Sequence, residues 1–95
     1  MKVRSAKNVF RYLGFGQEEA ENLRIRAALM VELTERIRTA GWTQKEAAGT
    51  VGVSQPRISD LMRGKIDVFS IDTLVAMLAR AGIKTSIRVG SKKIA

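Results

Sequence analysis

The chain has 95 residues, enough for one small domain with a short arm at either end. It contains neither cysteine nor histidine, so disulfides and thiolate metal sites are excluded, and the commonest general base and transition-metal ligand are missing. Seventeen Lys and Arg against nine Asp and Glu give a net charge of +8. That excess is either an ordinary solvated surface or an attraction to a polyanion such as nucleic acid. Only three of the nine acidic residues lie after position 46, which favours the second interpretation.

We expect no catalytic residues, no metal ligands and no cofactor. Without His or Cys, catalysis would rest on carboxylates, and no inward-facing pair of carboxylates is evident. The longest apolar runs are far shorter than the roughly 18 residues that cross a bilayer. The basic N-terminus also lacks the apolar core of a signal peptide. A cytoplasmic protein that is not an enzyme and has no membrane partner is therefore expected.

Residues 1–16 are expected to form a basic N-terminal arm that ends near two glycines. Its large apolar side chains either cover the end of the helix that follows or dock on a partner protein. Burial within the chain's own core is the more ordinary fate of an apolar arm. These side chains are Val9, Phe10, Tyr12, Leu13 and Phe15.

Residues 17–82 are expected to form the folded domain, and its first helix runs over residues 17–40. Nothing in that stretch breaks a helix, and Gly41 supplies a C-terminal stop. Apolar or small residues recur there every three or four positions, which predicts one buried stripe. The expected stripe consists of Leu23, Ala27, Met30, Thr34 and Ile37.

The segment TQKEAAGTVGVSQPRISDLMRGK, at residues 43–65, predicts two short helices joined by a tight turn. Thr43 and Glu46 form a capping box, in which each side chain accepts a hydrogen bond from the backbone N–H of the other. Gly52 can take the positive φ of the turn, and Ser54 is a good N-cap for the second helix. We expect a helix-turn-helix within residues 43–64. Its apolar inner face should comprise Ala47, Ala48, Val51, Val53, Ile58 and Leu61, with Met62 as a candidate extension. A purely structural helical hairpin with a solvated outer face is the alternative.

A further helix is expected between a cap at Ser70 and a stop at Gly82. Apolar and polar residues then alternate over residues 83–89, which is the period of a β-strand. That strand would pair either with its counterpart in a second chain, as a dimer contact, or within its own chain, with residues 8–10. Residues 90–95 should be a loose tail.

The segment at 43–65 resembles the helix-turn-helix of the lambda-repressor-like, or XRE, family. More closely, SQPRISDLMRGKIDVFSIDTLVAMLARAGIKTSIRV is similar to HigA-type antitoxins, and NVFRYLGF near the N-terminus fits that group. The resemblance covers most of the chain. It implies an all-α fold, a compact domain of four to five helices with a short C-terminal β-strand. It also implies a homodimer that reads a palindromic operator in double-stranded DNA.

The resemblance further implies that the second short helix enters the major groove. Gln55 matches the first reading position, where a Gln can bond N6 and N7 of adenine together. Pro56 could pack on a thymine methyl, and Ser59 could meet a base edge or a phosphate through water. Arg57 could reach a guanine edge or a phosphate. Asp60 could accept from a cytosine amino group, orient Arg57 or its other arginine neighbour, or remain solvated.

Contacts to the DNA phosphates are expected at the ends of the two short helices and just beyond them. The residues concerned are Gln44, Lys45, Ser54, Arg63 and Lys65.

The leading function hypothesis is a transcriptional repressor that is also an antitoxin. Such a protein would repress its own operon and neutralise a RelE- or HigB-like toxin encoded beside it. A stand-alone, phage-like XRE repressor without a toxin is the first alternative. A protein-interaction adaptor that uses the same fold without reading DNA is the second, although it would not need a polar, basic outer face on the reading helix.

Overall fold

The computed structural model describes residues 16–90, and its regular elements are all helical. In chain order they are α2 (Gln17–Ala40), α3 (Gln44–Val51), α4 (Gln55–Met62), the 3-10 helix η1 (Ile66–Val68) and α5 (Ile71–Arg80). Residues 1–15 and 91–95, which include most of the expected arm and tail, lie outside the described residues.

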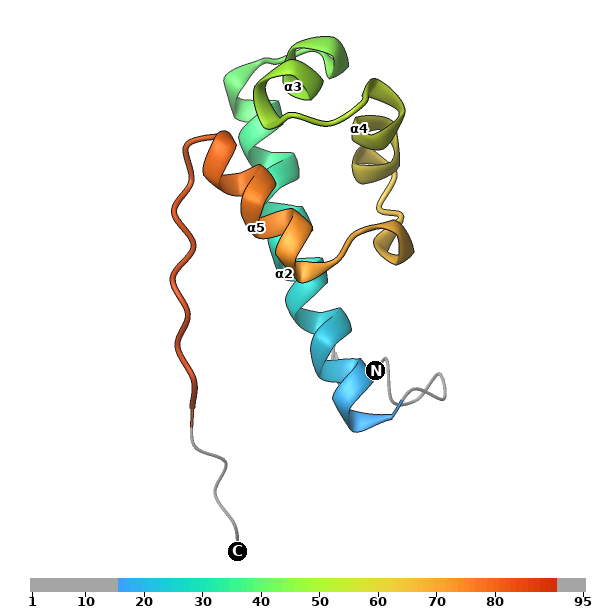
Figure 1. Cartoon of the computed structure of the whole chain (residues 1–95), viewed down its shortest axis with the longest axis vertical. Helices are drawn as coiled ribbons and strands as arrows, with labels where there is room; N and C mark the ends of the chain where they lie inside the picture. Colours follow the sequence, from blue (N-terminus) through green and yellow to red (C-terminus); the bar gives the residue numbers. More distant parts are fainter. Residues whose placement is uncertain (1–15, 91–95) are drawn as a thin grey trace, which may run out of the picture.

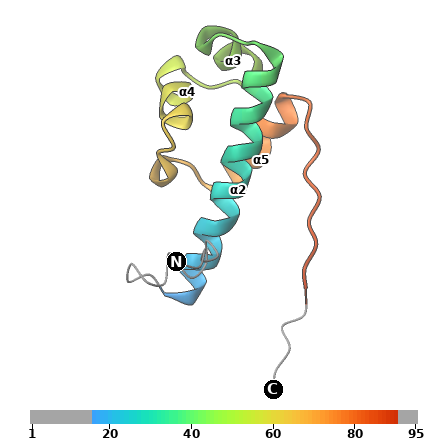
Figure 2. The same cartoon turned by 180° about the vertical axis from the view of Figure 1, so that it is seen from behind.

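Helix α2 forms the long axis of the domain, and the other helices gather around it (Figure 1). Helix α5 packs alongside α2, and α3 lies near the C-terminal end of α2, in contact with both α4 and α5. Figure 2 shows that α4 stands on the opposite side of α2 from α5. The helix-turn-helix is therefore held by α2 and α5, while much of α4 remains at the surface.

One cluster of buried apolar side chains joins α2, α3, α4 and α5. The inner face expected for the helix-turn-helix is present, since its two alanines, Val51, Ile58 and Leu61 are buried and Val53 packs against them in part. The stripe on α2 differs from the expected one: Ala20 and Leu33 are fully buried, whereas Ala27 and Thr34 are only half-buried. Phe69, just before α5, is a further core residue that helical periodicity did not indicate, because it belongs to no helix.

Local signals place the helix ends. The Glu46 backbone N–H donates to Thr43 Oγ1 over 3.1 Å, and the Thr43 N–H donates to Glu46 Oε1 over 2.8 Å, so the capping box is complete. Ser54 Oγ accepts from the Arg57 backbone N–H over 3.3 Å at the start of α4. Gly52 ends α3 with a φ of 76°, a conformation that glycine adopts without steric cost.

The β-strand expected at residues 83–89 is wrong for the described chain. From Ile83 onward these residues form no strand. Ile83 still packs against the core, and the segment that follows it runs clear of the helices in both views (Figures 1 and 2). The Ile83 N–H still donates to the Leu78 carbonyl over 2.9 Å, which closes the end of α5. A strand exists only where a second strand accepts and donates its backbone hydrogen bonds, and no described segment lies beside this one to do so. Ile87 and Val89 are accordingly 83% and 88% exposed.

Among the described helices, none is both long enough and apolar enough to cross a membrane.

Candidate nucleic-acid interface

Helix α4 presents the polar side chains of its first turn to solvent. Ile58 and Leu61 are buried in the core and fix the inward side of this helix. At a rotation of about 100° per residue, Pro56 then falls on the outside with Gln55 and Arg57 at the flanks, and all three are exposed. An eight-residue helix of this kind is about 12 Å long, which is comparable with the width of the DNA major groove.

The start of α3 and the outer face of α4 share one shallow pocket of about 360 Å³. Gln44 lines it from the first turn of α3, and Gln55, Pro56 and Ser59 line it from α4. The structure thus brings one residue expected at a phosphate next to three that were expected at base edges. Such a neighbourhood suits a duplex, in which the phosphates flank the base edges of the groove.

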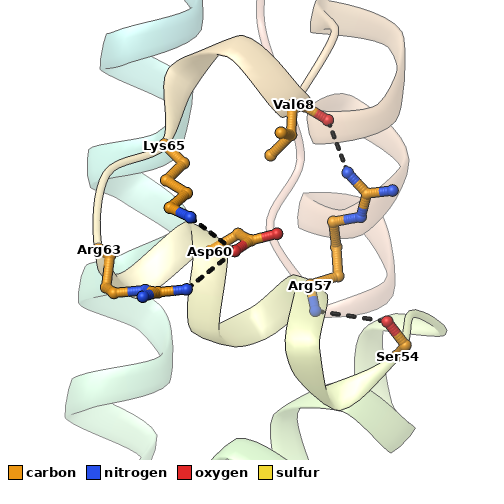
Figure 3. Close-up of polar contacts among 6 residues, drawn as sticks. All are labelled: Ser54, Arg57, Asp60, Arg63, Lys65 and Val68. Carbon is orange, nitrogen blue, oxygen red and sulfur yellow. Dashed lines mark hydrogen bonds and ion pairs between the residues drawn. The ribbon is translucent and has the colours of Figure 1, made fainter.

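The Arg57 side chain turns toward the loop that follows α4. Its Nη1 donates to the Val68 carbonyl over 2.9 Å, and its guanidinium carbon lies 5.7 Å from the centre of the Phe69 ring. Figure 3 shows the side chain reaching across to Val68, while its backbone N–H is held by Ser54. In this structure the guanidinium is therefore engaged within the chain.

Asp60 lies between two cations that were expected at phosphates. Its Oδ1 accepts from Arg63 Nη2 over 3.2 Å and lies 3.8 Å from Lys65 Nζ, as Figure 3 shows. The Asp60 carbonyl also accepts from the Lys65 backbone N–H over 3.0 Å. Among the roles considered for Asp60, this geometry agrees with the one in which its carboxylate orients Arg63. The same carboxylate also holds Lys65. Arg57 is not the arginine that it orients.

The remaining expected site residues are Lys45 and Ser54. Lys45 is exposed in the first turn of α3, where its charge is free to face a phosphate. Ser54 is occupied as an acceptor at the N-cap of α4, but its hydroxyl retains a donor. The candidate interface therefore has three parts: the shared pocket, the Asp60 cluster with its two cations, and Arg57 against the loop.

Sequence reasoning missed Arg26 of α2. Its Nη1 donates to the carbonyls of Ile66 and Phe69, over 3.1 and 3.3 Å, and its Nε donates to Asn22 Oδ1 over 2.7 Å. Arg26 thus holds, from another helix, the same loop that Arg57 contacts. No local signal could have indicated this, because Arg26 and Ile66 are brought together only by the tertiary fold.

Comparison with known proteins agrees with this architecture. Residues 12–90 match the model of a helix-turn-helix domain family. An HTH-type transcriptional regulator of Haemophilus influenzae, itself uncharacterised, is 32% identical over 80 residues, covering 84% of this chain and 81% of that protein. A solved structure described as a candidate XRE-family transcriptional regulator superposes with a TM-score of 0.73 at 28% identity, covering 78% of this chain and 83% of the other. The chain therefore belongs to the helix-turn-helix domain family and has the fold of an XRE-like regulator.

Proposed function

We propose that the protein is a sequence-specific DNA-binding transcriptional regulator of the bacterial cytoplasm, whose α4 enters the major groove. The observation that carries this proposal is the pocket in which Gln44 of α3 meets Gln55, Pro56 and Ser59 of α4. Side-chain amides at the start of a helix are suited to bidentate contacts with adenine. The Lys65 and Arg63 cations beyond the end of α4 supply charge for the phosphates.

The regulator acts as a two-fold homodimer on a palindromic operator in this proposal. One eight-residue helix contacts few base pairs, and two such helices about 34 Å apart would read two half-sites on the same face of the DNA. The exposed, alternating segment at 83–89 supports a dimer contact, since a second copy could supply the missing strand.

We extend the proposal to an antitoxin that represses its own operon and neutralises a RelE- or HigB-like toxin. The support is the resemblance of SQPRISDLMRGKIDVFSIDTLVAMLARAGIKTSIRV to HigA-type antitoxins. To test this, the protein is expressed together with the product of the reading frame next to its own gene, and the two are checked for co-purification. Absence of any stable complex would leave a stand-alone repressor.

The test of DNA reading is capture of sheared genomic DNA at about 150 mM salt, followed by sequencing, because that salt weakens purely electrostatic binding. The matched control carries Gln44→Ala and Gln55→Ala together, which removes two neutral side chains and leaves the net charge at +8. We expect a sharp palindromic peak beside the protein's own gene, lost in the control. Diffuse capture that is identical for both proteins would overturn sequence-specific reading and favour the adaptor function.

A further inference from the structure

The loop between α4 and α5 is held by arginines from two different helices. Arg26 of α2 donates to the carbonyls of Ile66 and Phe69, and Arg57 of α4 donates to the carbonyl of Val68. The three acceptors lie within one short stretch that contains η1. All three contacts are hydrogen bonds from a charged donor, which are stronger than those between neutral groups.

This loop follows directly after α4 and is contacted by its Arg57. Helix α4 has only eight residues, and a helix of that length has little stability of its own. Its first turn is fixed by the Ser54 cap, and its last turn is closed by the Lys65 backbone N–H, which donates to the Asp60 carbonyl before the chain enters η1. Phe69 is 2% exposed and anchors the far end of the loop in the core. The Arg57 contact to this loop therefore adds a second attachment of α4 to the core, beside the buried Ile58 and Leu61.

We infer that Arg57 is a positioning residue, which together with Arg26 clamps the loop and fixes the orientation of α4, and that it does not itself read a base. A bidentate contact with guanine needs two donors of the guanidinium aligned with the base edge. To reach that geometry, Arg57 would have to leave both the Val68 carbonyl and the Phe69 ring. Base reading then falls to the pocket residues Gln55 and Ser59. The effect on DNA binding rests on the proposed function, whereas the clamp on the loop does not.

The experiment measures two quantities, the base preference and the affinity for DNA. Wild type and the variants Arg57→Gln, Arg57→Lys and Arg26→Gln are each selected on a pool of randomised DNA duplexes, and the bound sequences are counted. Circular dichroism melting establishes that every variant is folded at the temperature used. We expect Arg57→Gln to lower affinity by about tenfold, the effect of losing one charged hydrogen bond, and Arg26→Gln, which loses two contacts to the loop, to lower it at least as much. Neither should change the preferred base at any position.

Two further results distinguish positioning from direct contact. Arg57→Lys should recover most of the affinity, because an ammonium group can still donate to the Val68 carbonyl but has no planar pair of donors for guanine. The double variant Arg26→Gln/Arg57→Gln should lose less affinity than the two single losses combined, since both residues hold one loop.

Loss of preference at a single guanine in Arg57→Gln and Arg57→Lys would show that Arg57 reads a base. A fall of about one unit in the salt slope would show a phosphate contact instead. Either result overturns the inference.

A separate measurement keeps the clamp testable if wild type shows no base preference, an outcome that would overturn the proposed function. Amide hydrogen exchange of the free protein should speed up at residues 63–70 in both Arg57→Gln and Arg26→Gln. Lys45→Gln removes the same charge from the exposed start of α3 and should leave exchange at residues 63–70 unchanged. Unaltered exchange in both arginine variants would overturn the clamp, whatever the DNA experiments give.

Discussion

The Arg80 guanidinium of α5 lies directly against Gly52, at the turn between α3 and α4. A Cβ atom added to Gly52 would collide with Arg80 Nη1, and the backbone there has a φ of 76°. We expect Gly52→Ala to lower the free energy of unfolding by about 1–2 kcal/mol from the left-handed backbone alone, and by more if Arg80 cannot move. Urea denaturation measures this change. The double variant Gly52→Ala/Arg80→Ala separates the two causes, since only the backbone strain persists in it.

Gly49→Ala should have the opposite effect. Gly49 lies in the middle of α3 and is exposed, and an added Cβ would meet nothing within 4 Å. Alanine favours a helix over glycine by about 1 kcal/mol, so the unfolding midpoint should rise. A variant that is no more stable than wild type would contradict the helical backbone at this position. The same variant also tests the candidate interface, because unchanged DNA affinity would place Gly49 outside it.

The helices were predictable from local chemistry, because each carries its own start or stop. The capping box at Thr43, the serine caps at Ser54 and Ser70, and the glycine at Gly41 act within one turn of the chain. Periodicity also indicated which side of α4 faces outward, because Ile58 and Leu61 are three residues apart and therefore lie on the same, buried side of the helix.

The features that escaped prediction depend on partners far away in the sequence or in another molecule. Nothing near Arg57 in the sequence indicates that its guanidinium meets the carbonyl of Val68, and Arg26 reaches the same loop from 40 residues away. The pocket shared by Gln44 and Gln55 required the placement of α3 against α4. The expected strand failed for a related reason: alternation specifies which side chains would share a face, but a strand also needs a neighbour.

Asp60→Asn should strengthen DNA binding without altering base preference. The Asp60 carboxylate, whose side chain is 25% exposed, lies against Arg63 and Lys65 and repels the phosphates that those cations would meet. We expect a modest gain in affinity for every sequence, measured by fluorescence anisotropy on several duplexes. Stability should fall by no more than about 1 kcal/mol, because partly exposed ion pairs are screened by solvent. Loss of preference at one cytosine would instead identify Asp60 as a base-reading residue.

Gln55→Ala and Lys65→Ala should weaken binding in different ways. Loss of the Gln55 amide should cost about 1–3 kcal/mol at one or two base pairs and relax the preference there. Loss of the Lys65 ammonium should weaken all sequences alike and reduce the salt slope by about one unit. Titrations of an operator and its single-base variants at several salt concentrations measure both effects. If Gln55→Ala leaves the preferred site unchanged, then α4 is not the reading helix.

Residues 83–89 are the proposed dimer contact, and their two faces differ in character. Side chains alternate between the two faces of an extended segment, so Ile87 and Val89 lie on one face and Ser86 on the other. Burial of both apolar side chains between two copies would contribute about 1.5–3 kcal/mol for each one, in addition to the backbone hydrogen bonds of a paired strand.

We expect Ile87→Asp and Val89→Asp each to shift the protein from dimer to monomer in analytical ultracentrifugation, and to weaken binding to a palindrome more than to a single half-site. Ser86→Asp is the matched control, because it adds the same charge to the same segment but on the other face, and it should remain dimeric. If all three variants keep the mass of wild type, the segment is not the dimer contact. The exposed Ile87 and Val89 side chains would then be available to a different partner protein, for which a toxin bound at this end of the domain is the first candidate to test.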